Sequence, residues 1–366
     1  MNSKTKNILV ELAFSVLAII ISFMIGAIVI LFIKGNPLEV FGTMFSGAFG
    51  SLSNFADTLE YATPLMFTGM AVAFAFRAGL FNIGAEGQLY AAAFAVAVVG
   101  FMLKLPPFLH ITVVILTALI VGGLWAYVPG VLKAKLGVHE VITTIMMNYI
   151  ALDLTNYLTM RNVFKQPGQI PQTKDILHSA QFGTMTFLSK YTHLNSGIII
   201  AVVVAVIVYF VIARMKLGYE IKVTGYNSNA AAYGGINNKN KLIIAMVISG
   251  AIAGLAGAEQ VAGVMHHFVS PFPVGIGFMG IAVALLGKND PFGVIAAALL
   301  FGALSAGGTQ VDTMTTVPRE VIDIIQAIII LFVASEVFLR KLIVQRIKQR
   351  KYRKMLEQSN LEQLDV

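Results

Sequence analysis

The sequence predicts an all-α, polytopic membrane protein with about ten transmembrane helices, two pseudo-repeated halves and several short or broken helices. Of its 366 residues, 57% are hydrophobic and 12% are charged, whereas an ordinary globular protein has about 25% charged residues. The apolar stretches are long and continuous, and in lipid only helices or closed barrels satisfy the backbone. The absence of cysteine excludes a disulfide framework, a thiol nucleophile and a Cys-ligated metal. The composition also excludes a disordered chain and a soluble nucleic-acid-binding domain.

The predicted spans correspond to ten apolar stretches, because a helix needs about 20 apolar residues to cross a bilayer. In chain order they are Ile8–Ile33, Ala62–Phe76, Gly87–Leu103, Ile111–Leu132, Val141–Leu158, Ile198–Ala213, Leu242–Val264, Gly275–Leu286, Phe292–Ala306 and Val321–Phe338. Ala62–Phe76, Gly275–Leu286 and Phe292–Ala306 are short for a crossing, and each abuts Gly, Pro or polar residues. Such interrupted segments are typical of the pathway of a transporter.

The two ends of the chain predict its orientation. Ile8–Ile33 is too long for the core of a signal peptide and has no small-x-small cleavage site after it, so we expect a retained span. Most of the 26 Lys and Arg residues then fall on the side of the termini, which predicts that both termini are cytoplasmic. The loop Arg161–Asn195 carries basic residues on the other side, and a missed crossing there would change the number of spans.

We expect the chain to divide into a transmembrane domain, residues 1–339, and a basic cytoplasmic tail, residues 340–366. The tail has eight basic residues between Arg340 and Lys354. Such a tail is expected to contact anionic headgroups, with a specific partner site as the alternative.

An internal echo supports two halves. Gly69–Ala73 reads GMAVA and Gly280–Ala284 reads GIAVA. Each lies in an apolar run that meets a polar break, at residues 77–84 and 287–293, and each break leads into an Ala-rich span. The shared order favours a duplication over chance similarity between small apolar residues.

The segment Phe81–Gln88 is the most unusual in the chain, because Asn82, Glu86 and Gln88 stand with two glycines between apolar runs. Two interpretations stay open. Glu86 can cap the following helix, since an anion is favoured at a helix N-terminus. Alternatively these side chains belong to a gate or to the translocation path, since polar groups at membrane depth are costly.

Three further polar residues are candidates for the path. Asn148 lies at helical spacing from Thr143 and Thr144 and either faces the path or, as we favour, bonds to neighbouring helices. Glu259 and Gln260 lie near the end of an apolar stretch, either within the membrane as a functional pair or at its outer interface. No HExxH pattern, phosphate-binding loop or nucleophile elbow occurs, so no catalytic or metal-binding residue is predicted.

The loop 216–241 predicts a short helix outside the membrane. Asn227 or Ser228 can cap its start, the alanines at 230–232 favour helix, and Gly234 can end it. A plain connector does not need such a helix, whereas a helix that transmits force from a cytoplasmic motor does. A surface helix without a partner is the alternative.

These segments together resemble the inner-membrane permeases of ATP-binding-cassette importers, in the ribose, branched-chain amino acid and nucleoside permease superfamily, nearest to its nucleoside or simple-sugar branch. The shared blocks are Asn36–Glu39 with Phe45–Gly50, Gly79–Gln88, Glu140–Ile142 through Asn148–Ile150, Gly225–Ile236 and Gly277–Gly287. Three positions depart from the family pattern: Ser228 replaces Pro, Gly235 replaces Ala, and Met279 replaces a polar residue. The last departure weakens the expectation that position 279 contacts a polar substrate.

The resemblance implies a transport subunit without enzymatic activity, whose cargo is a nucleoside or alternatively a simple sugar such as a pentose. It implies that the loop is a coupling helix docking onto a cytoplasmic ATPase, through Gly225, Asn227, Ala230, Ala231, Tyr233, Gly234 and Ile236. This chain would bind no cofactor, and ATP and Mg²⁺ would lie on the ATPase. The other implied partners are a second homologous permease, an extracytoplasmic substrate-binding protein or lipoprotein, and the lipid bilayer, but no nucleic acid. A less favoured alternative is an ion-coupled secondary carrier that uses Glu259.

Overall fold

The computed structural model describes residues 20–186, 192–318 and 320–332, and within these ranges every regular element is a helix. The all-α prediction is confirmed for this part of the chain. A helix at Ile20–Phe32 comes first and one over residues 320–332 comes last. Between them lie α2 (Pro37–Phe49), α3 (Leu52–Arg77), α4 (Ala85–Met102), α5 (Pro107–Leu136), α6 (Glu140–Thr159), η1 (His178–Ala180), α7 (Gly197–Arg214), α8 (Lys216–Tyr226), α9 (Ser228–Tyr233), α10 (Asn238–Ala258), η2 (Glu259–Met265), α11 (Ile276–Leu286) and α12 (Pro291–Met314).

Six of the described helices are long and apolar enough to cross a membrane: α3, α4, α5, α7, α10 with η2, and α12. The chain is therefore a multi-pass membrane protein. Ten spans and two repeated halves stay predictions. The basic tail and the start of the first predicted span lie outside the described residues.

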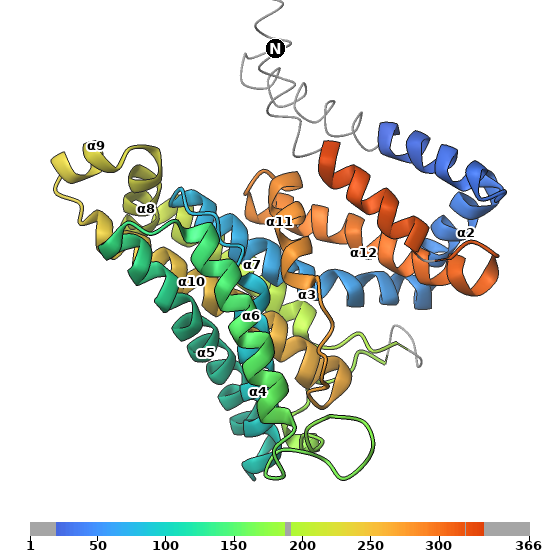
Figure 1. Cartoon of the computed structure of the whole chain (residues 1–366), viewed down its shortest axis with the longest axis horizontal. Coiled ribbons are helices and arrows are strands. Elements are labelled where there is room, and N and C mark those ends of the chain that lie inside the picture. The colour runs from blue at the N-terminus through green and yellow to red at the C-terminus, as the bar shows by residue number, and fades with distance from the viewer. Residues whose placement is uncertain (1–19, 187–191, 319, 333–366) are drawn as a thin grey trace, which may run out of the picture.

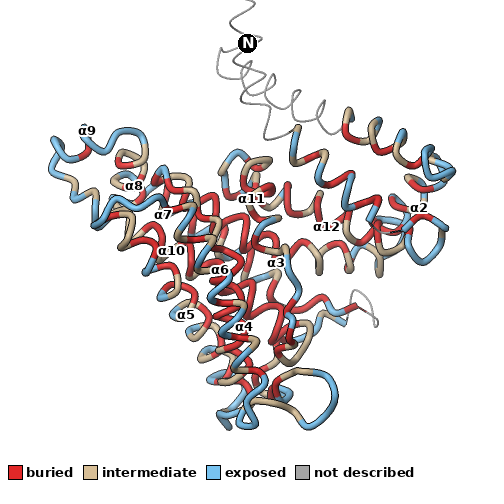
Figure 2. Tube along the Cα trace, in the orientation of Figure 1, coloured by how far each residue is buried: buried red, intermediate tan, exposed pale blue. Residues whose placement is uncertain are grey.

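Helix α3 lies at the centre of the fold (Figure 1). On one side it packs against α10, which in turn packs against α4 and α5, and on the other side it packs against α11 and α12. Figure 2 shows the buried residues concentrated where these helices meet, while α9 is largely exposed. The helices on the two sides of α3 diverge, and the candidate site lies between them.

Two of the three helices predicted to be short are full-length. Ala62–Phe76 is the second part of α3, which has 26 residues, and Phe292–Ala306 belongs to α12, which has 24. Polar residues such as Glu60 before the first run, and Thr309 and Gln310 after the second, limit the apolar runs in the sequence, although they belong to the helices. Helix α11 is short as predicted, with 11 residues. Helix α2 was not predicted. Asn36 caps its start, because the Asn36 side chain accepts a hydrogen bond from the Leu38 N–H at 3.1 Å.

The two echoed segments pack against each other. A Cβ added to Gly69 would lie 2.6 Å from the Val283 side chain, and one added to Gly280 would lie 2.6 Å from Thr68. The polar breaks that follow them also meet, because the Arg77 guanidinium donates a 2.6 Å hydrogen bond to the Asn289 carbonyl. Asn289 is itself in a left-handed conformation, with φ of 55°. The ends of α3 and α11 are therefore joined at one point.

Candidate functional site

A cavity of about 610 Å³ lies between the diverging helices. It falls within the range of about 300–1,000 Å³ that is typical of small-molecule sites. Its apolar lining is formed by Pro64, Leu65, Val264, Met265, Pro273, Val274, Gly275, Ile276 and Met279. Its polar lining is formed by Glu60, Tyr61, Gln260, Ser305, Asp323 and Gln326.

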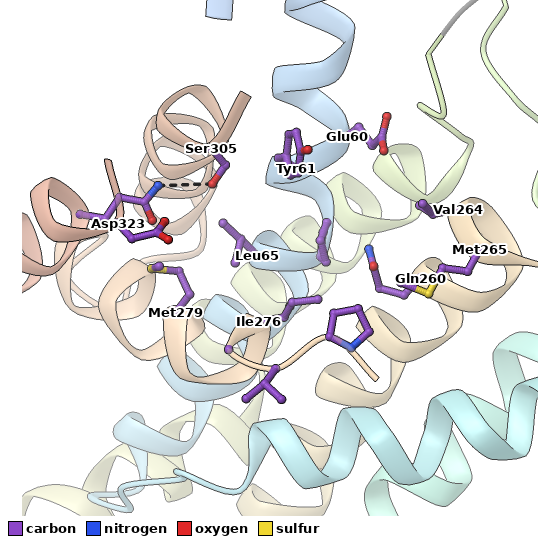
Figure 3. Close-up of a pocket in the computed structure, with 15 residues that line it drawn as sticks. Glu60, Tyr61, Leu65, Gln260, Val264, Met265, Ile276, Met279, Ser305 and Asp323 are labelled. Carbon is purple, nitrogen blue, oxygen red and sulfur yellow. Dashed lines mark hydrogen bonds between the residues drawn. The ribbon is translucent and has the colours of Figure 1, made fainter. Parts of the chain in front are cut away.

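The polar side chains come from four helices that are far apart in sequence. Figure 3 shows Ser305 of α12 and Asp323 on one side of the cavity, Gln260 of η2 across it, and Glu60 and Tyr61 of α3 between them. Met279 and Ile276 of α11 lie along another side. The cavity thus has polar groups on opposite walls and an apolar surface formed largely by α11 and the second half of α3.

Glu60 and Tyr61 also line a neighbouring cavity of about 260 Å³, together with Asp57 and His193. The Glu60 carboxylate accepts a hydrogen bond from the His193 backbone N–H at 3.1 Å. Tyr61 lies 3.4 Å from the Thr309 hydroxyl. The first turns of α3 therefore attach the loop before α7 to the wall of the site.

Glu259 and Gln260 occupy different positions relative to the cavity. Both belong to η2, a π-helix, a conformation that often marks functional sites. Gln260 lines the cavity, whereas Glu259 is fully buried behind it. The Glu259 carboxylate accepts hydrogen bonds from Asn195 at 3.0 Å and from Gln260 at 2.9 Å. Glu259 therefore holds the orientation of Gln260.

Asn82 and Gln88 form a buried amide pair next to the first break. Each side chain donates to the other, at 3.0 and 3.1 Å. Asn82 also donates to the Ser249 hydroxyl at 2.8 Å, and its oxygen accepts from the Gly84 N–H at 2.9 Å. Ser249 in turn donates to the Ala71 carbonyl at 2.6 Å. These bonds tie the break to α3 and α10, away from the cavity lining.

Glu86 caps α11 rather than its own helix. Its carboxylate accepts hydrogen bonds from the backbone N–H groups of Gly275 at 2.6 Å, Gly277 at 2.5 Å and Phe278 at 3.3 Å. The Tyr90 hydroxyl donates to it at 2.6 Å. These N–H groups are left without intrahelical partners at the start of a helix, and the positive end of the helix dipole favours a carboxylate there.

Asn148 of α6 plays the corresponding part for α4. Its side-chain oxygen accepts from the Gly87 N–H at 2.8 Å, and its amide donates to the Ile83 carbonyl at 2.9 Å. Asn82, Glu86, Gln88 and Asn148 are thus brought together around one break, and none of them lines the cavity. Their involvement in a gate or path stays a prediction.

The predicted short helix is present as α9, projecting from one end of the molecule (Figure 1). The Asn227 side chain accepts from the N–H groups of Asn229 at 3.0 Å and Ala230 at 3.1 Å, and Gly234 follows the last residue. Ala231 is 0% exposed, whereas Tyr233 is 94% exposed. The helix therefore presents Tyr233 outward and rests on Ala231.

The departures from the family pattern at 228 and 235 are accommodated locally. The Ser228 hydroxyl donates to the Thr224 carbonyl at 3.1 Å, which joins α9 to α8. Gly235 has φ of 78°, in the left-handed region that favours glycine over alanine. Ile236 lies directly after this turn, where its N–H donates to the Ala231 carbonyl at 3.0 Å.

Helix α8 is attached to the helix bundle at two points. A Cβ on Gly225 would overlap the carbonyl oxygen of Arg77, so the backbones of α8 and the first break lie in direct contact. Glu220 forms a 2.6 Å ion pair with Lys241 of α10. The hydrogen bond from Lys241 holds the pKa of the Glu220 carboxyl below its usual value.

Sequence reasoning missed Glu60, Tyr61, Ser305, Asp323 and Gln326. Glu60 and Tyr61 directly precede the predicted span Ala62–Phe76, so hydropathy alone leaves them outside it. Asp323 and Gln326 lie within the last predicted span, Val321–Phe338, where polar residues are a signal in themselves. Their spacing of three residues on a helix places both on one face.

Several apolar helices around a polar-lined cavity, with a capped helix projecting beyond them, are features of a membrane transport subunit. The chain belongs to the family described as branched-chain amino acid transport system / permease component, whose profile matches residues 54–334. Membership makes it a transport component of an ABC system, which implies an ATPase and a substrate-binding protein as partners.

The chain is similar along most of its length to three curated permeases. It is 42% identical to the guanosine ABC transporter permease protein NupP of Bacillus subtilis, over 88% of this chain and 93% of the relative. It is 39% identical to the nucleoside ABC transporter permease protein NupB of Lactococcus lactis, over 91% and 92%. It is 31% identical to the glucose ABC transporter permease protein TsgB13 of Haloferax volcanii, over 89% and 88%. No solved structure matches the chain.

Proposed function

We propose that this chain is the permease subunit of an ABC importer that carries nucleosides across the cytoplasmic membrane. The observation that carries the proposal is its similarity over most of its length to two permeases named for guanosine and nucleoside transport, at 42% and 39% identity. The cavity is consistent with that cargo, because a nucleoside combines a flat aromatic base, whose faces can pack on apolar side chains, with hydroxyl groups. Its lining offers an apolar surface together with carboxylates and amides.

The energy for transport comes from a separate cytoplasmic ATPase, which binds ATP and Mg²⁺. Helix α9 is the surface on which we expect the ATPase to dock, through the segment Gly225–Ile236. The cap that Asn227 provides for α9 and the exposure of the Tyr233 side chain support this role. A second homologous permease completes the membrane part, and an extracytoplasmic binding protein or lipoprotein delivers the cargo.

In the topology that we propose, about ten spans are arranged as two repeated halves with both termini in the cytoplasm. The packing of the two echoed segments supports the halves. The distribution of basic residues supports the orientation. The tail of residues 340–366 then faces the anionic cytoplasmic leaflet.

A simple-sugar importer is the second candidate, favoured by the 31% identity to a glucose permease. Its chemistry overlaps with that of a nucleoside through the hydroxyl groups. A sugar lacks the flat aromatic base whose face the surface around Ile276 and Met279 would accept.

Uptake in proteoliposomes tests the proposal. The permease pair, the ATPase and the binding protein are reconstituted with ATP inside the vesicles, and uptake of labelled guanosine, ribose and glucose is compared. We expect concentrative guanosine uptake that requires ATP and resists an uncoupler, with none in vesicles that contain this chain alone. Uptake of sugar without guanosine would support the second candidate. Accumulation by this chain alone, or abolition by an uncoupler at constant ATP, would contradict ATPase-driven import.

A further inference from the structure

The cavity has one wall that is built from neighbouring polar side chains. Asp323 and Gln326 lie three residues apart on the helix over residues 320–332, so they project from the same face. Both line the cavity, and the Gln326 amide lies 3.4 Å from the Ser305 hydroxyl of α12. Figure 3 shows Asp323 and Ser305 on this wall. The wall therefore presents a carboxylate, an amide and a hydroxyl side by side.

The Asp323 carboxylate lies at the wall of the cavity. Asp323 is exposed, and within residues 20–186, 192–318 and 320–332 it has neither a hydrogen bond nor an ion pair. The other lining carboxylate, Glu60, already accepts the His193 N–H. A carboxylate on an apolar helix next to membrane spans is costly unless it faces water or a polar solute. Asp323 faces the cavity, where such a solute has access to it.

The chemistry of the wall selects hydroxyl groups. An ionised carboxylate only accepts hydrogen bonds, and its two oxygens can accept from two neighbouring hydroxyls at once. Gln326 adds both a donor and an acceptor beside it. Among the described lining residues there is no Lys or Arg to neutralise a phosphate, while Asp323 and Glu60 both repel one. The lining is thus matched to an uncharged solute that carries a diol.

The remaining lining completes the match. Leu65, Ile276 and Met279 provide an apolar surface next to the polar wall. Met279 stands where the family pattern often has a polar residue, so this surface is more apolar than the family pattern would make it. The flat face of a nucleobase can lie against this surface while the ribose of the same molecule reaches the carboxylate. A free sugar has no base to fill the apolar surface.

We propose that Asp323 and Gln326 bind the 2′,3′-diol of a ribonucleoside in the cavity and determine the preference of the permease for ribonucleosides over 2′-deoxyribonucleosides. This inference rests on the proposed function, because it assigns the cavity to the cargo. The base occupies the apolar surface formed by Leu65, Ile276 and Met279. Ser305 holds the Gln326 amide in place from the neighbouring helix.

The test compares guanosine and 2′-deoxyguanosine uptake by the complete transporter in proteoliposomes, at saturating binding protein so that the permease sets the rate. The unaltered complex is expected to prefer guanosine. Asp323→Asn keeps the shape of the side chain but removes its charge and one acceptor, and it is expected to lower the ratio of kcat/KM values by about tenfold, as for a lost hydrogen bond to a charged group. Asp323→Glu is expected to retain part of the preference.

Glu320→Gln is the matched control, because it removes a carboxylate from the same helix at an exposed position outside the cavity lining. It is expected to leave the ratio unchanged. Co-purification of the ATPase and its basal activity show whether each variant has folded and assembled. An unchanged ratio in an assembled Asp323→Asn complex that imports guanosine overturns this inference alone. Failure of the unaltered complex to import any nucleoside overturns the proposed function instead.

Discussion

Glu86 is a buried carboxylate whose partners account for its burial. It receives three backbone N–H groups from the start of α11 and the hydroxyl of Tyr90. Isolated charges are very costly to bury, and this one is stabilised by charge-assisted hydrogen bonds and by the dipole of α11. The sequence could single out Glu86 as unusual, but its helix partner Gly277 lies 191 positions away. Local sequence carries no information about such a pairing.

Replacement of Glu86 separates its two interpretations. Glu86→Ala leaves the three N–H groups without partners, at about 1–3 kcal/mol for each buried unsatisfied group, so the free energy of unfolding should fall by about 3 kcal/mol or more. Thermal unfolding in detergent measures this loss. Glu39→Ala, an exposed change on α2, is the control and should shift the stability by less than about 0.5 kcal/mol. Lost uptake with unchanged stability would instead favour a direct role in the pathway.

At the scale of single elements, local signals were sufficient for some helices and not for others. Helix α9 could be predicted because its cap, its alanines and its terminal glycine are adjacent in sequence. The full lengths of α3 and α12 could not, because Glu60 and Tyr61 in α3, and Thr309 and Gln310 in α12, resemble loop residues when only hydropathy is considered. The polar half of a transport helix looks like the end of the helix when only hydropathy is considered.

The docking role of α9 is best tested at Tyr233. Ala231 is fully buried beneath the helix, so a charge there would disrupt α9 itself, whereas Tyr233 is 94% exposed. Tyr233→Asp should preserve the folded permease but reduce ATPase co-purification and ATP-driven uptake by at least tenfold, because it places a charge at the centre of the proposed interface. Asn240→Asp adds the same charge at an exposed site at the start of α10 and should have little effect. Full uptake by Tyr233→Asp would argue against docking at α9.

At the scale of the whole molecule, the loop after α6 is attached to the end of η2 and the segment that follows it. The Phe182 N–H donates to the Ala262 carbonyl, the Ile176 N–H to His266, and the Thr173 N–H to Phe268, each at 2.8 Å. Burial lowers the pKa of His266, and the nearby His193, His267 and His178 lower it further, while Asp175 opposes them. This end of the molecule therefore favours neutral His266.

The stability of the molecule should consequently depend on pH. Because the pKa of His266 is lower in the folded state, the folded state binds fewer protons, and stability present above about pH 6.5 is lost as the pH falls through the folded value. The Tm measured in detergent should decrease as the pH is lowered from about 7.5 to 5.5. His266→Asn, which tolerates the left-handed backbone at φ of 62°, should flatten this dependence. The exposed His178→Asn should change it only slightly, because His178 contributes less to the lowered pKa of His266 than burial, His193 and His267 do. Equal slopes for His266→Asn and the unaltered chain would exclude His266 as the cause.

The arrangement of the helices required the structure for a further reason. The similarity of Gly69–Ala73 and Gly280–Ala284 was visible in the sequence, but a shared pattern does not say whether two segments touch. Their direct packing, and the assembly of the cavity from α3, η2, α11, α12 and the helix over residues 320–332, depend on contacts between distant parts of the chain.

The contact between Gly225 and Arg77, and the bond from Arg77 to Asn289, have a mechanical consequence. Because Gly225 has no side chain, the backbones of α8 and the end of α3 are in direct contact. The Arg77 guanidinium in turn joins the end of α3 to Asn289, in the turn that connects α11 to α12. We therefore expect a displacement of α8 to act on α3 and on the turn between α11 and α12 together.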